Sequence, residues 1–278
     1  MTLIVLTGAG ACAIWATVAI LVSLGHDRWF FEPNNSTSGR HGAVLNLPVG
    51  RAEILIRRYG SADARRIAVF FPGAGGYSRF WIELSILLPL SREATVYAIC
   101  YPGHGGARGR IATSALVRAL PRVMNAIRED CGRASVEMVY FGDCYGASLA
   151  MAAAKSDRPR GLVLNSVSVS EARFFRAWLR QRAYRTVLLP FAVFSRNFRS
   201  KEQFAALSEV PIIIFQGEND DMAPIAPLRK IIGTTAKIVP VARAGHFDFP
   251  WDAARNYVRS ILEMFEDAPG PRGRDMAT

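Results

Sequence analysis

Apolar residues fill the first 25 positions, and the rest of the chain alternates short apolar runs with amphipathic stretches. Residues 2–25 carry no charged side chain, and residues 3–24 are almost wholly apolar. An apolar helix of about 22 residues, rising ~1.5 Å per residue, spans a hydrocarbon core of ~30 Å. A cleaved signal peptide has a basic region ahead of a shorter apolar stretch, whereas no Lys or Arg precedes this one. The pattern therefore predicts a retained transmembrane anchor at residues 1–25, with a signal peptide as the alternative.

The charges that flank the apolar segment predict its orientation. Arg28 and Arg40 follow the segment, and only the terminal amine precedes it. Because Lys and Arg favour the cytoplasmic side of a membrane helix, we expect the rest of the chain in the cytoplasm, at the inner membrane if the source is bacterial. Turn-forming residues dominate positions 32–42, so residues 26–50 are predicted to form a linker.

Beyond position 50 the hydrophobic pattern is that of a domain with alternating strands and helices. Strands are expected at 53–58, 67–71, 95–100, 136–141, 162–165, 212–215 and 237–241. Helices are expected at 79–88, 111–129 (with a kink or break at Pro121), 145–155, 224–232 and 251–265. This alternation is typical of a mainly parallel sheet with helices on both faces. The sequence therefore predicts an α/β domain at residues 51–267 and a disordered tail at 268–278.

One long stretch interrupts the alternation. Residues 169–210 contain no strand pattern and are rich in aromatic and basic side chains. An insertion at this point of an α/β sheet lies over the carboxyl ends of the strands, where ligands bind. We therefore expect a helical lid, with Phe174 and Trp178 as candidates for its substrate-facing wall; packing against the sheet is the alternative. The arginines of this segment form either a solvated face or a contact with anionic lipid headgroups.

Composition narrows the function classes. Half of the residues are hydrophobic and 21% are charged, which excludes a disordered or collagen-like chain. The four cysteines are too scattered for a disulfide framework or a CxxC zinc site. The 34 basic and 23 acidic residues give a net charge of +11. Most of the basic residues are arginines, which genome composition alone can produce, so we expect no nucleic-acid partner.

The sharpest motif is GDCYG at residues 142–146, which follows an apolar strand and precedes a helix. It matches the Gly-x-Ser-x-Gly nucleophile elbow with Cys144 in place of serine, and the glycines permit the tight turn. The helix N-terminus favours a thiolate, and the backbone N–H of Tyr145 can donate to an oxyanion. The neighbouring Asp143 opposes ionisation of the thiol unless its carboxylate points to solvent or pairs with a lid arginine. An inert buried thiol is the alternative for Cys144.

The partners that a nucleophilic thiol needs come later in the chain. QGENDDMAP at residues 216–224 follows the next-to-last strand, and AGHF at 244–247 follows the last. A thiol needs a base within reach, and the base needs a carboxylate to orient it. We assign His246 as the base and Asp220 as the acid, with Asp221 and Asp248 as alternatives for the acid.

These motifs together resemble the α/β-hydrolase superfamily, from about residue 53 to residue 265. Gly217-x-x-Asp220 and Gly245-His246 match its acid and histidine loops, and YPGHGG at 101–106 matches its common loop after the fourth strand. FPGAGG at 71–76 is similar to the oxyanion loop of thioesterases that release acyl chains from carrier proteins. The resemblance implies that the backbone N–H of Ala74 is the second oxyanion donor. Cys144 departs from the usual serine, as in dienelactone-hydrolase-like and polyester-synthase-like members.

The resemblance implies an α/β-hydrolase fold and a hydrolase of esters or thioesters that works through Cys144, His246 and Asp220. Together with the apolar segment at residues 1–25, it predicts a membrane-anchored hydrolase. The expected substrate is a small-molecule or lipid-like acyl compound, with a medium to long acyl chain. No metal or organic cofactor is implied. An acyltransferase with the same thioester intermediate is one alternative, and a non-catalytic module that binds a membrane surface is another.

Overall fold

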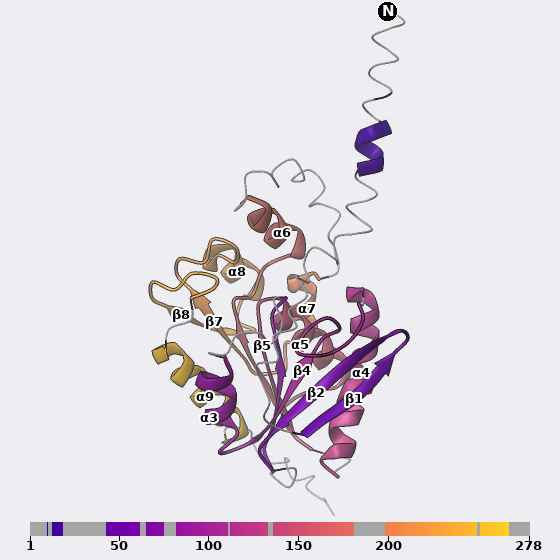
Figure 1. The fold of residues 1–278 in the computed structure, drawn as a ribbon. Coiled ribbons are helices and arrows are strands. Elements are labelled where there is room, and N and C mark those ends of the chain that lie inside the picture. Colours follow the sequence, from indigo (N-terminus) through magenta and orange to yellow (C-terminus); the bar gives the residue numbers. More distant parts are fainter. Residues whose placement is uncertain are drawn as a thin grey trace, which may run out of the picture.

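An eight-stranded sheet forms the centre of the molecule (Figure 1), with the strand order β1-β2-β4-β3-β5-β6-β7-β8. The computed structural model describes residues 10, 13–18, 43–61, 65–74, 82–110, 112–132, 136–180, 198–248 and 251–266. The strands are β1 (Ala43–Val49), β2 (Ala52–Tyr59), β3 (Ile67–Phe71), β4 (Thr95–Cys100), β5 (Met138–Asp143), β6 (Gly161–Asn165), β7 (Ile212–Gly217) and β8 (Lys237–Val241). The strands β1 and β2 are antiparallel to their neighbours, and β3 to β8 are parallel.

Helices cover both faces of this sheet. They are the π-helix η1 (Glu83–Leu87), α3 (Leu88–Leu90), α4 (Thr113–Asp130), α5 (Tyr145–Ser156), α6 (Glu171–Arg180), α7 (Ser200–Ala206), α8 (Ile225–Ile232) and α9 (Trp251–Glu266). Apolar residues of α4, α5, α7 and α8 pack on one face, and those of η1, α3 and α9 pack on the other. Along β3 the side chains alternate between the two cores, because successive residues of a strand point to opposite faces: Ile67, Val69 and Phe71 join the first and Ala68 and Phe70 the second.

The expected mainly parallel α/β architecture is confirmed, and the predicted strands all lie within observed ones apart from the first two residues of 136–141. The linker boundary is wrong. Residues 43–49, which we assigned to the linker 26–50, form the strand β1, so the domain includes the chain from Ala43 onward. The strand contains Pro48, which is tolerated because β1 lies at the edge of the sheet formed by the described residues. The break expected at Pro121 does not occur, since α4 is one helix from Thr113 to Asp130.

Several expectations fall largely outside the described residues. Of the predicted anchor at 1–25, only residues 10 and 13–18 are described. None of the helices in the described part of the chain is long and apolar enough to span a membrane. The tail 268–278 and the first part of the linker are not described. Within the predicted lid at 169–210, the helices α6 and α7 are described and residues 181–197 are not.

Candidate active site

The elbow between β5 and α5 places Cys144 in a strained backbone conformation. Its φ is 55° and its ψ is −112°, in a region that side-chain-bearing residues rarely adopt. The two glycines of the motif explain why the chain accepts this conformation. A Cβ on Gly142 would lie 2.7 Å from the carbonyl oxygen of Gly146, and a Cβ on Gly146 would overlap the carbonyl oxygens of Phe71 and Pro72. Only glycine therefore lets α5 begin this close to β3, with Cys144 at the turn.

The structure brings the three predicted triad residues together. The Nε2 atom of His246 lies 3.2 Å from Sγ of Cys144, and its Nδ1 atom lies 2.8 Å from Oδ2 of Asp220. These residues lie 102 and 26 positions apart in the sequence, at the carboxyl ends of β5, β7 and β8. Burial by itself would lower the pKa of His246, but the charge of the Cys144 thiolate and the hydrogen bond to Asp220 outweigh it and raise this pKa well above 6.5. The arrangement favours the protonated form of His246.

Asp220 is held by its own loop as well as by His246. Its side chain is buried, and Oδ1 accepts hydrogen bonds from the backbone N–H groups of Met222 (3.0 Å) and Ala223 (2.7 Å). Asp221 is exposed, and Asp248 accepts a hydrogen bond from the N–H of Gly245 instead of contacting the imidazole. The geometry therefore selects Asp220 among the three candidate carboxylates.

Gln216 is a functional residue that the sequence reasoning missed. Its fully buried amide donates to Oδ2 of Asp220 (3.1 Å) and to the carbonyl of Ala223 (2.5 Å), and its Oε1 accepts from the N–H of Val167 (2.9 Å). These bonds connect the end of β7 with the acid loop and with the segment after β6. A polar side chain at the end of an otherwise apolar strand was the available signal.

The side chain of Asp143 is bonded to the neighbouring strand. Its Oδ1 atom accepts a hydrogen bond from Nδ2 of Asn165 at 2.7 Å. Asp143 and Asn165 are register partners on the adjacent parallel strands β5 and β6, so sheet pairing brings them together. The carboxylate is directed along the sheet edge by this amide.

The two candidate oxyanion donors belong to backbone segments that both lie next to Cys144. Tyr145 is the first residue of α5, so its N–H has no intrahelical acceptor, and its hydroxyl is fixed by a 2.7 Å bond to Thr113. Ala74 follows Gly73, and a Cβ added to Gly73 would lie 3.6 Å from the Cβ of Cys144. The Tyr101 hydroxyl fixes the loop after β3 by donating a hydrogen bond to the carbonyl of Pro72 at 3.0 Å. Both backbone segments are therefore close enough to Cys144 for their N–H groups to be candidate oxyanion donors.

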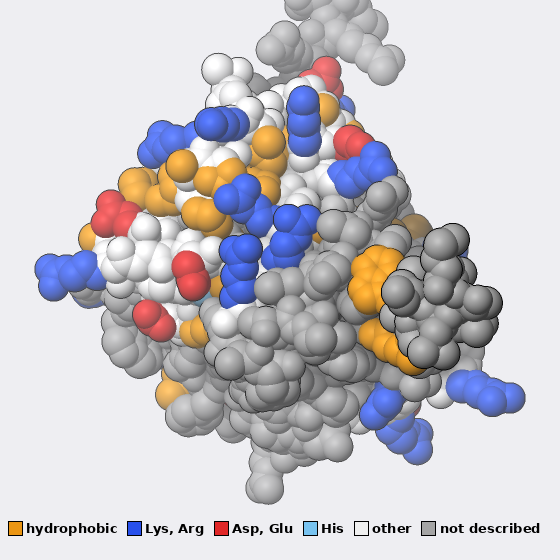
Figure 2. Space-filling model, turned by 90° about the horizontal axis from the view of Figure 1, so that it is seen from above, with side chains coloured by type: hydrophobic (Ala, Val, Ile, Leu, Met, Phe, Trp, Pro, Cys, Tyr) orange, Lys and Arg blue, Asp and Glu red, His pale blue; other side chains and the backbone are white. Residues whose placement is uncertain are grey.

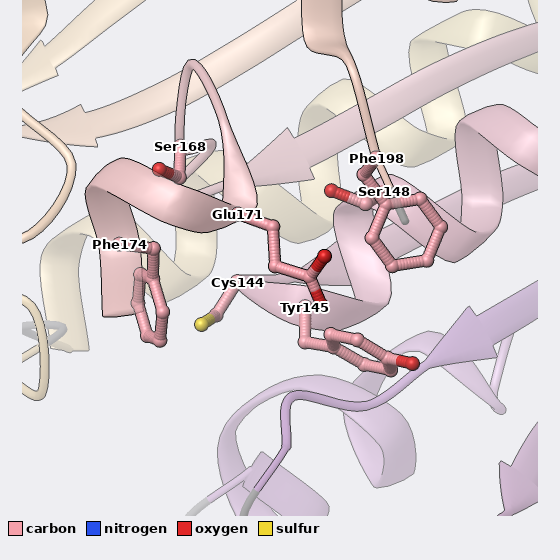
Figure 3. A pocket seen from close by; sticks show the side chains of 7 residues that line it. All are labelled: Cys144, Tyr145, Ser148, Ser168, Glu171, Phe174 and Phe198. Atoms are coloured by element: carbon pink, nitrogen blue, oxygen red, sulfur yellow. The ribbon is translucent and has the colours of Figure 1, made fainter. Parts of the chain in front are cut away.

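A small pocket opens beside the sulfur (Figure 3), with a volume of about 20 Å³. It is lined by Cys144, Tyr145, Ser148, Ser168, Glu171, Phe174 and Phe198. The centroid of the Phe174 ring also lies 5.2 Å from the centroid of the His246 ring, so this predicted lid residue is part of the candidate site. The side chain of Trp178, the other predicted lid residue, is not described. Glu171 is buried and was not anticipated, because a charged residue at a helix start is usually exposed.

The other described cysteines are packing residues. Cys100 and Cys131 are buried, and burial raises the pKa of Cys100 to about 11, although Arg57 opposes this. The described residues contain no group of three or more His, Cys, Asp or Glu side chains that could hold a metal ion.

Comparison with known proteins places this fold and site in a family. Residues 68–209, about half of the chain, match the alpha/beta hydrolase family. The chain belongs to that family. Its membership makes it an enzyme of the hydrolase class. An uncharacterized protein of Mycobacterium tuberculosis is 25% identical over 227 residues, which cover 79% of this chain and 67% of that protein.

Solved structures share the fold at lower identity. The thioesterase domain from the curacin biosynthetic pathway is 16% identical, with a TM-score of 0.57 over 80% of this chain and 100% of its own. A bacterial membrane phospholipase A is also 16% identical, with a TM-score of 0.59 over 96% of this chain and 100% of its own. An esterase of Pyrococcus furiosus is 12% identical, with a TM-score of 0.64 over 85% of this chain and 94% of its own. At these identities the likeness is one of fold.

The elbow glycine gives a prediction about stability. In Gly146→Ala the new methyl group meets backbone carbonyl oxygens, which cannot rotate away, so we expect a loss of at least about 3 kcal/mol or failure to fold. Gly161→Ala is the matched control, because its methyl group meets mainly the flexible Met264 side chain and should cost only about 1 kcal/mol. Urea denaturation of both variants measures the difference, and equal losses would contradict the close approach of α5 to β3.

The raised pKa of His246 gives a prediction about pH. A pKa above 6.5 means that the imidazolium persists through neutral pH and is lost as the pH rises through the raised value. Asp220→Asn removes one of the groups that raise this pKa, so the titration should move to lower pH, and turnover should fall by roughly 10–10³-fold. NMR titration of the His246 ring measures the shift. Asp221→Asn is the control. It should leave the midpoint of the titration unchanged and turnover within a few-fold of wild type. The reverse pattern would assign the acid to Asp221.

Proposed function

We propose that this hydrolase cleaves ester or thioester bonds with Cys144 as nucleophile, His246 as acid and base, and Asp220 as the group that orients the imidazole. The observation that carries the proposal is the continuous chain of contacts from Sγ through the imidazole to a buried carboxylate, at 3.2 and 2.8 Å. A merely structural cysteine does not need a histidine and a fully bonded carboxylate in line with it. The non-catalytic alternative gives no reason for this arrangement.

The reaction follows from the charges of the three groups. The Cys144 thiolate attacks the acyl carbonyl carbon, and the N–H groups of Tyr145 and Ala74 stabilise the oxyanion that forms. The bond from carbon to the leaving oxygen or sulfur breaks, and the His246 imidazolium gives its proton to the leaving group. His246 then takes a proton from water, which attacks the thioester and releases the acid and the thiolate. Asp220 keeps the imidazole in the required tautomer throughout.

The size of the pocket favours a short acyl group. Its volume of about 20 Å³ holds one or two water-sized groups, which is too small for the medium to long chain expected from the aromatic lid. Phe174 and Phe198 close the pocket on the lid side. A longer chain therefore requires these rings to move, and we expect turnover to decrease as the acyl chain lengthens.

Acyl-enzyme formation tests the nucleophile. With a series of acyl thioesters from acetyl to octanoyl, wild-type protein should gain the acyl mass on Cys144, most rapidly with the shortest chains. Cys144→Ala should show neither the adduct nor turnover, and Cys144→Ser should keep a small fraction of turnover. Intact mass spectrometry and peptide mapping read the adduct. An adduct on another residue, or wild-type turnover by the alanine variant, rules Cys144 out, and acyl transfer to an added alcohol in preference to water would make the enzyme an acyltransferase.

We also propose that the apolar segment at residues 3–24 anchors the enzyme in a membrane with the catalytic domain in the cytoplasm. The support is the uncharged length of this segment and the arginines that follow it. One solved structure with the fold is a membrane phospholipase A, which shows that the fold occurs in a membrane protein. We expect the full chain to remain in the membrane fraction after a sodium carbonate wash, with residue 1 or 2 as its N-terminus. A mature N-terminus beyond residue 20 excludes the anchor, and a C-terminal reporter active only outside the cytoplasm reverses the orientation.

A further inference from the structure

Helix α6 borders a second cavity, which is larger than the Cys144 pocket and is lined by other residues of the helix. Its volume is about 490 Å³, within the range of about 300–1,000 Å³ that small-molecule sites occupy. The lining residues are Val169, Ser170, Arg173, Arg176, Ala177, Arg180 and Asp221. The cavity is thus large enough for a ligand, whereas the pocket at the sulfur is not large enough for more than a small group.

The cavity is strongly basic. Arg173, Arg176 and Arg180 are spaced three and four residues apart, so their side chains lie along one face of α6. All three are exposed, and none forms an ion pair with another residue that the structure describes. Asp221 is the only acidic residue among those that line the cavity. Figure 2 shows Lys and Arg side chains gathered on this upper side of the molecule, next to hydrophobic ones.

Two connections place the cavity beside the catalytic centre. Asp221 directly follows Asp220, the carboxylate bonded to His246. Phe174, which directly follows Arg173, contacts the His246 ring and the Cys144 pocket. Because His246 gives its proton to the leaving group in the proposed reaction, the leaving group lies on the histidine side of the thiol. Helix α6 carries both the Phe174 ring, which contacts His246, and the arginines that line the cavity, so the cavity is a candidate site for the leaving-group end of the substrate.

We propose that this cavity binds the phosphate of an acyl donor whose leaving group is phosphorylated, an assignment that rests on the proposed acyl chemistry of Cys144. Guanidinium groups bind phosphate through paired, charge-assisted hydrogen bonds, and three of them in one row suit a phosphate mono- or diester. Like charges at this spacing repel one another, so an anion is the ligand that the row accepts best. The donor is either a water-soluble phosphorylated thioester or a phosphorylated glycerolipid, since both present the same group.

A matched pair of thioesters tests the proposal. Butyryl coenzyme A and butyryl N-acetylcysteamine have the same reacting bond, and only the first carries phosphate. We expect kcat/KM for the coenzyme A donor to be at least about tenfold higher in wild type, and this ratio to fall by about tenfold in Arg173→Gln/Arg176→Gln/Arg180→Gln. Arg122→Gln, at an exposed position on α4, is the control and should keep the wild-type ratio. An unchanged ratio in the triple variant, or an equal fall for both donors, excludes the thioester as the source of the phosphate; Arg176→Gln alone serves if the triple variant does not fold.

The lipid source is tested with dibutyryl phosphatidic acid and dibutyrylglycerol, the same pair of chains with and without phosphate. A phosphate preference in either pair that the arginine substitutions remove supports the proposal, and the pair that shows it identifies the source. No preference in either pair overturns it. Loss of binding to phosphatidylglycerol vesicles with both ratios unchanged also overturns it and assigns the arginines to membrane contact.

A further measurement separates this proposal from the function on which it rests. If neither thioester is turned over, calorimetric titration of coenzyme A into Cys144→Ala still measures whether the cavity binds a phosphorylated ligand. Binding that the arginine substitutions abolish supports the anion site while the proposed hydrolysis fails, and absence of binding overturns the site. Equal kcat/KM within the thioester pair and within the lipid pair overturns the site while the hydrolysis stands.

Discussion

The close approach of helix α5 to strand β3 is the constraint on which the site depends. Gly146 has no room for a side chain against the backbone of Phe71 and Pro72, so α5 begins almost in contact with the end of β3. The chain can enter the helix this early only by passing through a left-handed conformation at Cys144, with φ 55°. The strain at the nucleophile is therefore a consequence of the packing, and the stability of the two core layers holds it in place. The same approach brings the N-terminus of α5 and the loop after β3 close to Cys144.

Asp220 is held in place by hydrogen-bond donors that surround its carboxylate. Asp220 accepts from two backbone N–H groups, from Gln216 and from His246, and all of these groups are buried or nearly so. A carboxylate bonded in this way has little freedom to turn, so the imidazole is oriented before substrate arrives. On the opposite side of the imidazole lies the thiol, which is only half-buried and can be reached from the pocket. The site thus combines a fixed base with an accessible nucleophile.

Local sequence signals were sufficient for the features that local chemistry determines. The glycines of 142–146 predicted the elbow, and the position of Asp220 after Gly217 predicted the acid, because the turn directs one of two adjacent carboxylates inward and the other outward. Features that depend on neighbouring strands were missed. The contact between Asp143 and Asn165 follows from the register of β5 and β6, and β1 was assigned to the linker although its pairing with β2 makes it part of the sheet. The only sequence signal for Gln216 was a polar side chain at the end of an apolar strand, and Glu171 became recognisable when the fold placed it against the pocket.

Helix α6 connects the two halves of the proposed site, and this limits how the enzyme can open. The start of α6 is tied to the rest of the protein: Ser170 pairs with Arg199 in an isolated bridge, and the Ser200 hydroxyl donates to the carbonyl of Ser168 at 2.6 Å. Ser200 begins α7, which is bonded to α5 through Gln203 and the carbonyl of Ser148. The first turn of α6 is thus fixed relative to the nucleophile helix. Phe174 lies in this fixed turn, so the acyl pocket can enlarge only if the Phe174 ring rotates or the turn itself shifts. The arginine row continues from the same turn, so α6 holds the acyl pocket and the proposed anion site in one arrangement.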